Sequence, residues 1–360
     1  MSLWVVVGGQ YGSEGKGKIS AFITQQEQID ICIRCGGPNS GHSFLNETGE
    51  RILLRQLPTG YIRPQTRLLV PAGALVDLEV LKYELSFFGI NPERVGIDRN
   101  AIIIEEFDRI RESELQLRER LSSTICGVGS AVARRALRGD DVRTAGLAAR
   151  QVPWLKPLIT SVSDEANEAL DRGKKVLIEG TQGFGLSLYH ADSYPKTTSR
   201  DTTSAGFLSE VGLSPMLVTE VVVVFRTFPI RVAGEQAGPL KQEITWELVQ
   251  TESGYPCSVR ELTSVSKRIR RVARFDWELA ADAIRVNRPT RIVVNGLDYI
   301  EYKNYGVQDW RLLTSSGVTF LERLQNTFGV PVWGFGTAPN VLGLCSDLQA
   351  AFRSGREVCA

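Results

Sequence analysis

The chain has 360 residues, of which 42% are hydrophobic and 23% are charged. This composition is ordinary for a globular protein with a large core, and the formal net charge of +1 excludes a basic field that would hold a nucleic-acid polymer. Six cysteines are too sparse for a disulfide scaffold, and Cys32 and Cys35 have no second pair at zinc spacing, so we interpret both as strand residues.

The first residues, Met1 to Gly9, lack the basic and apolar regions of a signal peptide. No apolar run approaches the roughly 20 residues that span a bilayer. We therefore expect a cytoplasmic protein that has neither a membrane nor a nucleic-acid polymer as its partner.

The first motif along the chain is VVVGGQYGSEGKGKIS, residues 5 to 20. Val5 to Val7 predict a buried strand, and the glycine-rich loop after it leads into a helix. Such a loop aims backbone N–H groups and a helix N-terminus at one point, an anion site to which Lys16 and Lys18 add charge. A standard P-loop has a hydroxyl residue after the lysine, where this chain has Gly17. We predict a P-loop-like phosphate loop, and a tight strand–helix connection without a ligand is the alternative.

Short β-branched runs alternate with helical patterns along the rest of the chain. The alternation predicts an α/β fold with a mostly parallel central sheet flanked by helices, and we expect one domain over residues 1–360 because no repeat or linker divides it. The other predicted strands are Ile29 to Arg34, Leu68 to Val70, Ala101 to Ile104, Lys175 to Ile178, Val218 to Phe225 and Arg291 to Val294. The predicted helices are Leu75 to Phe88, Asp108 to Leu121, Trp154 to Arg172, Ile244 to Gln250 and Phe275 to Val286.

Polar, glycine-rich loops follow several of these strands, at the ends where α/β sheets place their sites. His42 lies in the loop GGPNSGHSF, which favours a catalytic or phosphate-contacting role, whereas we expect His190 to be structural. The loop EGTQGFG, Glu179 to Gly185, offers an acid, an amide and three glycines to a small polar ligand, or is a plain loop. The hydroxyl-rich run from Thr197 to Thr203 has donors for a monophosphate, although many solvated loops look the same.

The segment SVSKRIRRVARFD, residues 264–276, places five basic side chains within eight residues: Lys267, Arg268, Arg270, Arg271 and Arg274. No acidic residue balances them before Asp276. They predict either a solvated charged face or a site for a carboxylate, which arginine binds through two parallel hydrogen bonds.

Taken together, these segments resemble the adenylosuccinate synthetase family. The opening resembles the family's G-x-Q-[WFY]-G-D-E-G-K-G-K loop, and GGPNSGHSF resembles its G-G-x-N-A-G-H-T segment. The segments STICGVGSAVARRALR, EGTQGFG with YPKTTSRDTT, and TSVSKRIRRVARFD follow in the family's order. The resemblance implies a magnesium-dependent carbon–nitrogen ligase, which joins L-aspartate to C6 of a purine monophosphate after a nucleoside triphosphate has phosphorylated the purine O6.

The resemblance also implies the residues of the site. The catalytic residues would be Ser13, Lys16, His42 and Gln182, with Ser13 and the Gly41 carbonyl as magnesium ligands. The purine monophosphate would contact Asn39, Ser123, Thr124, Gln182 and Thr198, and Arg134 would reach it from the partner subunit of a homodimer. Arg268 and Arg270, helped by Ser266, would hold the aspartate carboxylates. The donor nucleotide would contact Gly12, Gly15, Lys16, Gly17, Lys18, Asn295, Asp298 and Gly336.

Two departures from the family pattern decide the substrates that we expect. Where the family has the aspartate that takes the N1 proton of IMP and ligates magnesium, this chain has Ser13, which leaves room beside C2 of the purine. That change resembles the phage branch, the 2-aminoadenylosuccinate synthetases, which take dGMP and would act in the host cytoplasm. The family reads guanine with T-K-L-D, whereas this chain has Asn295-Gly296-Leu297-Asp298, with GFGTAPN (residues 334–340) where the family closes around the donor base. We therefore expect ATP or dATP, rather than GTP, as the donor.

These observations predict a ligase that makes 2-amino-2′-deoxy-N6-succinyladenylate from dGMP and L-aspartate, for 2-aminoadenine DNA synthesis. The nearest alternative is an ordinary adenylosuccinate synthetase that uses IMP and GTP, with the missing base replaced through water or Glu14. An inactive nucleotide-binding regulator, and a kinase that transfers phosphate without aspartate, are alternatives of other classes.

Overall fold

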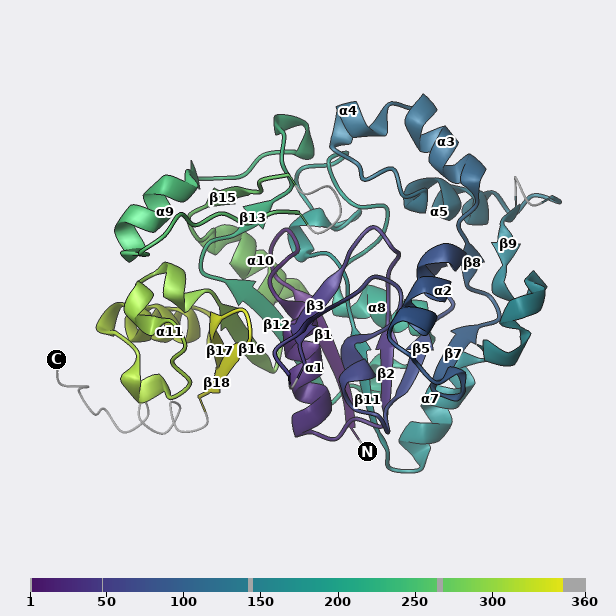
Figure 1. Cartoon of the computed structure of the whole chain (residues 1–360), viewed down its shortest axis with the longest axis horizontal. Coiled ribbons are helices and arrows are strands. Elements are labelled where there is room, and N and C mark those ends of the chain that lie inside the picture. Colours follow the sequence, from purple (N-terminus) through teal and green to yellow (C-terminus); the bar gives the residue numbers. More distant parts are fainter. Residues whose placement is uncertain (1, 47, 142–144, 264–267, 346–360) are drawn as a thin grey trace.

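A computed structural model of the chain describes residues 2–46, 48–141, 145–263 and 268–345. A sheet of ten strands crosses the molecule in the order β10-β7-β5-β2-β11-β1-β12-β16-β17-β18 (Figure 1). Its neighbouring strands are parallel, except for the antiparallel pair of β17 and β18. The predicted α/β fold with a mostly parallel sheet is confirmed. The strands are β1 (Ser2–Gly8), β2 (Ile31–Arg34), β5 (Arg67–Val70), β7 (Val95–Asp98), β10 (Ile159–Thr160), β11 (Lys175–Glu179), β12 (Glu220–Arg226), β16 (Arg291–Asn295), β17 (Val332–Ala338) and β18 (Val341–Leu344).

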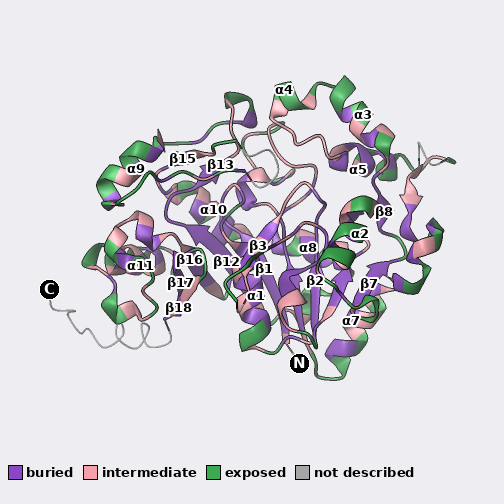
Figure 2. Cartoon of the chain, in the orientation of Figure 1, coloured by how far each residue is buried: buried purple, intermediate pink, exposed green. Residues whose placement is uncertain are grey.

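Helices cover both faces of this sheet, because the side chains of each strand alternate between two apolar cores. On one face, Leu3 and Val5 of β1 pack in a core with residues of α7 (Val162–Asp171), α8 (Ser204–Val211), α10 (Trp277–Asn287) and α11 (Ser315–Phe328). On the other face, Trp4 and Val6 pack with residues of α1 (Lys16–Gln26). Figure 2 shows the central strands buried, whereas the helices expose their outer sides. The carboxyl ends of the strands are thereby held at fixed positions along one edge.

Smaller groups of elements lie over that edge, at the top of the view in Figure 1. One group is α3 (Glu106–Glu114), α4 (Leu117–Leu121) and α5 (Val128–Leu137). The other group is a three-stranded sheet of β13 (Ile230–Arg231), β15 (Arg271–Ala273) and β14 (Glu243–Ile244), with α9 (Trp246–Ser253). The hairpin of β3 (His42–Leu45) and β4 (Arg51–Leu54) lies between them. A last small sheet, β6 (Leu75–Val76), β8 (Ile102–Ile103) and β9 (Leu147–Ala148), accompanies α2 (Leu78–Phe87).

Three predicted helices differ from the observed ones for local reasons. Leu75 and Val76 form strand β6, and α2 begins only after Asp77, whose carboxylate accepts the N–H groups of Glu79 and Val80. The helix predicted over 108–121 is divided into α3 and α4 at Gln116, whose φ of 52° is left-handed.

The helix predicted from Trp154 is a 3₁₀ segment over Pro153–Leu158 that contains Pro157, followed by β10, so that α7 starts at Val162. Proline has no N–H group to continue a helix. The strand predicted over 101–104 exists as β8 but lies in the last small sheet, outside the central one.

The predictions for the cysteines, for a metal cluster and for membrane spans can also be compared with the structure. Cys32 lies in β2 and Cys35 follows it directly, and both thiols are buried and free. Within the described ranges, the structure has no cluster of His, Cys, Asp and Glu residues suited to a metal ion. No helix in the same ranges has the length and apolar character needed to cross a membrane.

Candidate active site

The phosphate loop joins the end of β1 to the start of α1. Gly12, Ser13 and Gly15 have left-handed φ angles of 85°, 60° and 97°. Such angles cost little in glycine, and Ser13 is the one non-glycine residue among the three. A Cβ atom on Gly17 would lie 2.7 Å from Cβ of His42. The hydroxyl residue of a standard P-loop therefore does not fit after Lys16, because the β3 strand lies against this turn.

A buried carboxylate within the loop fixes its shape. Glu14 is 1% exposed, and its Oε1 accepts the backbone N–H groups of Gln10 at 3.1 Å and Gly12 at 2.8 Å. Its Oε2 lies 2.7 Å from Nζ of Lys16, which also donates to the carbonyl of Gln182. Because Glu14 is fully engaged, its geometry does not suit a proton acceptor for substrate. Its charge holds Lys16 at the mouth of the loop.

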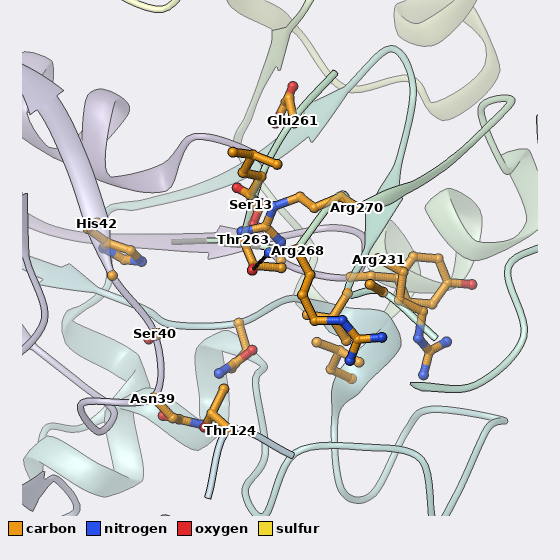
Figure 3. Close-up of a pocket in the computed structure, with 18 of the residues that line it drawn as sticks. Ser13, Asn39, Ser40, His42, Thr124, Arg231, Glu261, Thr263, Arg268 and Arg270 are labelled. Atoms are coloured by element: carbon orange, nitrogen blue, oxygen red, sulfur yellow. Dashed lines mark hydrogen bonds between the residues drawn. The ribbon is translucent and has the colours of Figure 1, made fainter. Parts of the chain in front are cut away.

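A cavity of about 690 Å³ opens in front of this loop (Figure 3). It brings together thirteen residues that the sequence predicts for the site: Gly12, Ser13, Gly15, Lys16, Gly17, Asn39, Gly41, His42, Ser123, Thr124, Gln182, Arg268 and Arg270. They come from segments far apart in the chain, at the carboxyl ends of β1, β2 and β11, in the loop after α4, and beside β15. The convergence supports the prediction of a ligand site and disfavours the interpretation of these segments as plain loops.

His42 is held by a buried acid at the end of β11. Its Nδ1 lies 2.5 Å from Oε1 of Glu179, which also accepts a hydrogen bond from Arg34 Nη1 at 2.8 Å. The second carboxylate oxygen accepts the N–H and the hydroxyl of Thr59, at 2.8 and 2.6 Å. An imidazole that donates from Nδ1 presents Nε2 as its free ring nitrogen. Glu179 therefore sets both the orientation and the tautomer of His42.

The charges of this pair follow from its surroundings. Burial and the neighbouring Arg34 guanidinium lower the pKa of His42 to about 4, despite the opposing effect of Glu179. Burial alone would raise the pKa of Glu179, but His42, Arg34 and Thr59 outweigh burial and hold it at about 2. At neutral pH the ring is therefore neutral and the carboxylate is ionised. A polyanion in the cavity would favour the imidazolium, because an opposite charge nearby stabilises the protonated form.

Two arginines project into the cavity from the segment that follows the 264–267 gap. In Figure 3 the side chain of Arg270 runs toward Ser13, whereas that of Arg268 extends toward Arg231. Arg270 lies close enough to Glu261 for the two charges to interact, while no acidic partner of Arg268 exists among the described residues. Arg268 thus offers an unpaired guanidinium in a cavity, the arrangement that suits a carboxylate ligand.

Four further residues predicted for the site lie together on the other side of the phosphate loop. Asn295, at the end of β16, donates from Nδ2 to the Glu14 carbonyl at 2.7 Å. Lys18 donates from Nζ to the carbonyls of Ala338 and Val341, both at 3.1 Å, and its charge interacts with that of Asp298. Burial lowers the pKa of Lys18 to about 8. A Cβ on Gly336 would lie 2.6 Å from Nζ of Lys18, so this glycine makes room for the lysine.

The remaining predicted residues lie outside the cavity lining. The N–H of Thr198 donates at 2.9 Å to the carbonyl of Leu186, which does line the cavity. Ser266 falls in 264–267, outside the described residues. His190 stacks on Phe184, with ring centroids 6.2 Å apart, in a position that fits a structural role.

Arg134 is 1% exposed, and its Nε and Nη2 donate to the two carboxylate oxygens of Asp108 at 2.8 and 2.6 Å. The guanidinium is therefore occupied within its own chain. A contact with a partner subunit's nucleotide stays a prediction, and it requires this ion pair to open.

The sequence interpretation missed several residues that line the cavity. Glu261 is the one acidic side chain among the described lining residues, and it forms an ion pair with Arg226. Arg226 also donates from Nη1 to the Ser13 carbonyl at 3.2 Å. Arg231 and Tyr11 form a cation–π pair, with 4.7 Å between the guanidinium carbon and the ring centroid. One feature of the sequence indicated Arg226 and Arg231, namely that each lies at or beyond the end of a strand.

Comparison with known proteins settles the family. The adenylosuccinate synthetase family model matches residues 5–153 and 147–306. An adenylosuccinate synthetase of Thermococcus onnurineus is 40% identical over 347 residues, which cover 95% of this chain and 97% of the relative. The chain belongs to the adenylosuccinate synthetase family. A Methanocaldococcus jannaschii adenylosuccinate synthetase is also 40% identical, over 94% of each chain. The protein is therefore a carbon–nitrogen ligase of the adenylosuccinate synthetase type.

Two solved synthetase structures share the fold. The fully ligated adenylosuccinate synthetase of Plasmodium falciparum superposes with a TM-score of 0.80 at 19% identity, over 96% of this chain and all of that one. The succinoaminodeoxyadenylate synthetase (PurZ) of cyanophage S-2L superposes with a TM-score of 0.79 at 25% identity, over 99% of both chains. That structure holds dGMP, and dATP as an energy donor.

The family depends on magnesium, and the cavity can be tested for it. Oxygen atoms of Ser13 and Gly41 line the cavity beside Lys16. Magnesium in nucleotide enzymes keeps several waters and binds through one or two protein oxygens together with substrate phosphates. The residues present fit a cation held mainly by phosphate and water, for which Ser13 and Gly41 would be the predicted protein ligands.

The depressed pKa of His42 predicts acid sensitivity of the fold. Between pH 6.5 and 4 the unfolded chain protonates this histidine while the folded synthetase does not, so stability falls as the pH falls. We expect the loss due to His42 between pH 7 and 4.5 to be about 2 kcal/mol, measured as the difference between wild type and His42→Gln in urea unfolding. Equal pH dependence of His42→Gln and wild type would contradict the assignment.

Proposed function

We propose that this synthetase joins L-aspartate to C6 of dGMP, with ATP or dATP as the phosphoryl donor and 2-amino-2′-deoxy-N6-succinyladenylate as the product. The observation that carries the proposal is Ser13, which is exposed in the cavity at the position where the family has an aspartate. The cyanophage relative, with dGMP and dATP in its structure, supports the same pair of substrates. The product would supply 2-aminoadenine for DNA in a phage-infected cytoplasm.

The acceptor nucleotide occupies the part of the cavity formed by Asn39, Ser123 and Thr124, whose hydroxyl and amide groups donate hydrogen bonds to a monophosphate. Gln182 completes that side, and Thr198 lies behind the lining, hydrogen-bonded to Leu186. A serine at position 13 leaves space beside C2 of the purine, which the 2-amino group of guanine fills, and its hydroxyl can accept a hydrogen bond from that group. An aspartate there would occupy the same space.

The first chemical step moves the γ-phosphoryl group of the donor to O6 of the purine, and the nucleoside diphosphate leaves. The N1 proton of the purine passes to water, because Glu14 is engaged within the loop. Lys16 and the loop N–H groups hold the transferring group, and His42 stabilises the negative charge that develops on it. Magnesium supplies charge neutralisation to the phosphates when bound. Lys16 keeps its contacts with Glu14 and the Gln182 carbonyl in this step and offers its third N–H donor to the phosphate.

The second step forms the new C–N bond. The amino group of aspartate attacks C6, the C6–O6 bond breaks, and inorganic phosphate leaves with the O6 oxygen. Arg268 and Arg270, which both line the cavity, hold the two carboxylates of aspartate. Because the site holds aspartate and the nucleotide side by side, the entropy of bringing them together is lost on binding, before the bond forms.

The proposed donor base depends on the segment that replaces the family's T-K-L-D. The lysine of the family's T-K-L-D segment is replaced by Gly296, whose φ of 87° is left-handed. A Cβ at this position would lie 2.9 Å from Oγ1 of Thr227. A lysine does not fit this turn without a backbone change, which supports a donor other than GTP.

An ordinary adenylosuccinate synthetase that uses IMP and GTP is the second candidate, supported by the 40% identity to archaeal proteins of that name. IMP and dGMP both carry a proton on N1, so either acceptor needs a substitute for the missing aspartate base. Glu14 is buried and fully engaged, so that route would depend on water. An inactive regulator is disfavoured by the presence of Lys16, His42 and two arginines in one cavity. We also propose that the enzyme forms a homodimer.

The substitution Ser13→Asp tests the acceptor. Aspartate tolerates left-handed backbone better than most residues, so the loop should keep its shape. We expect the ratio of kcat/KM for dGMP to that for IMP to fall by about a hundredfold, the range that one pocket contact commonly gives. Ser13→Asn, of equal size without charge, separates steric exclusion from base chemistry. An unchanged ratio in an active Ser13→Asp variant would remove Ser13 as the selector.

The substitution Arg268→Ala tests the aspartate site. Loss of a charged hydrogen-bonded contact should raise the KM for aspartate by about 10- to 100-fold, while dGMP binding measured by calorimetry stays near normal. Arg271→Ala is the matched control, because Arg271 pairs with Glu243 and lies outside the cavity lining. If the KM for aspartate does not change in Arg268→Ala, Arg268 does not bind this substrate.

A further inference from the structure

Asp298 is a buried carboxylate beside the phosphate loop that the proposed chemistry does not use. It lies in the turn Leu297–Tyr299, directly after β16, and is 5% exposed. The same strand end carries Asn295, which is hydrogen-bonded to the loop at Glu14, and Lys18 of α1 lies within electrostatic range of Asp298. Asp298 belongs to the segment that the proposed function assigns to the donor base, and it lies next to the loop proposed to take the donor phosphates.

Asp298 is already engaged by a phenol. The hydroxyl of Tyr255 donates to Oδ2 of Asp298, with 2.5 Å between the oxygen atoms. Burial raises the pKa of Asp298 to about 6, in spite of this hydrogen bond, and the carboxylate is still ionised at neutral pH. Burial and the same carboxylate raise the pKa of Tyr255, so the phenol remains the donor.

Tyr255 is fixed in this position by its neighbours. It follows Gly254, which ends α9 with a left-handed φ of 71°. Its ring packs against Tyr302 and Tyr299, with centroids 4.6 and 5.7 Å apart. Packing against these two rings therefore holds the Tyr255 phenol in a fixed orientation.

Guanine and adenine offer different hydrogen-bond donors to a carboxylate. Guanine presents two adjacent donors, N1–H and the 2-amino group, which match the two oxygens of a free carboxylate. Adenine presents only its 6-amino donor beside the acceptor N1 on the corresponding edge. The Tyr255 hydroxyl takes one acceptor position on Oδ2, so it competes with the two-point contact that distinguishes guanine, and an unmet donor in a buried site costs affinity.

We propose that Tyr255 is a specificity-determining residue that selects an adenine-containing phosphoryl donor by occupying the Asp298 carboxylate. The inference rests on the proposed use of this region by the donor nucleotide. It explains how the chain can keep an acidic residue at this position without preferring GTP. Tyr255 acts through Asp298, and it takes no part in the chemical steps.

The test is the ratio of kcat/KM for ATP to that for GTP in Tyr255→Phe, measured by phosphate release with saturating aspartate. The acceptor is whichever of dGMP and IMP the wild-type enzyme turns over, so failure of the dGMP assignment leaves the donor test intact. We expect wild type to favour ATP at least tenfold. We expect the variant to lower this ratio at least tenfold, through improved use of GTP.

Tyr302→Phe is the matched control, because its ring belongs to the same cluster but no hydrogen bond joins it to Asp298 in the described structure. It should keep the wild-type ratio. If Tyr255→Phe is unstable, Tyr255→Leu removes the hydroxyl with a different side chain and tests the same point. A wild-type enzyme that prefers GTP, or a variant that loses activity with both donors equally, would overturn the proposal.

Discussion

The buried carboxylate of Glu179 ties the active site to the sheet. It stands at the end of β11, between the ends of β1 and β2, and bonds Arg34, His42 and Thr59 at once. A charged group with no exposed surface is tolerated only when such partners compensate its lost hydration, so removing any one of them would leave the buried carboxylate less well compensated. The network therefore fixes the β3 strand, which in turn leaves no room for a side chain at Gly17.

The phosphate loop depends on a second carboxylate in the same way. Glu14 takes up two backbone N–H groups of the loop and the Lys16 ammonium, so contacts within the protein hold the loop in shape. A preformed anion site loses less entropy on binding. The two carboxylates divide the work, since Glu14 shapes the loop that holds the donor phosphates and Glu179 orients the histidine that faces them. Neither is left to act as a base, which makes the uncharged Ser13 the defining feature of this cavity.

The loops of the site could be predicted because they follow strand ends, which parallel strands bring to one edge, whereas the roles of individual residues came from the family resemblance. Lys16, His42 and Gln182 met in the cavity for that reason, whereas Arg268 reaches it from beside β15 of the small antiparallel sheet. What could not be predicted depends on contacts between distant residues. The pairing of His42 with Glu179 spans 137 positions, and the engagement of Asp298 by Tyr255 spans 43. Helix boundaries failed where one residue decided them, as at Pro157 and Gln116.

The central claim is that the acceptor is dGMP. The most direct measurement is phosphate release by the wild-type enzyme with L-aspartate, magnesium and ATP, run side by side with dGMP and with IMP, with the nucleotide product identified by mass spectrometry. The account predicts turnover of dGMP, formation of the N6-succinyl product, and far weaker turnover of IMP. Efficient turnover of IMP with none of dGMP would contradict it and would make this protein an ordinary adenylosuccinate synthetase.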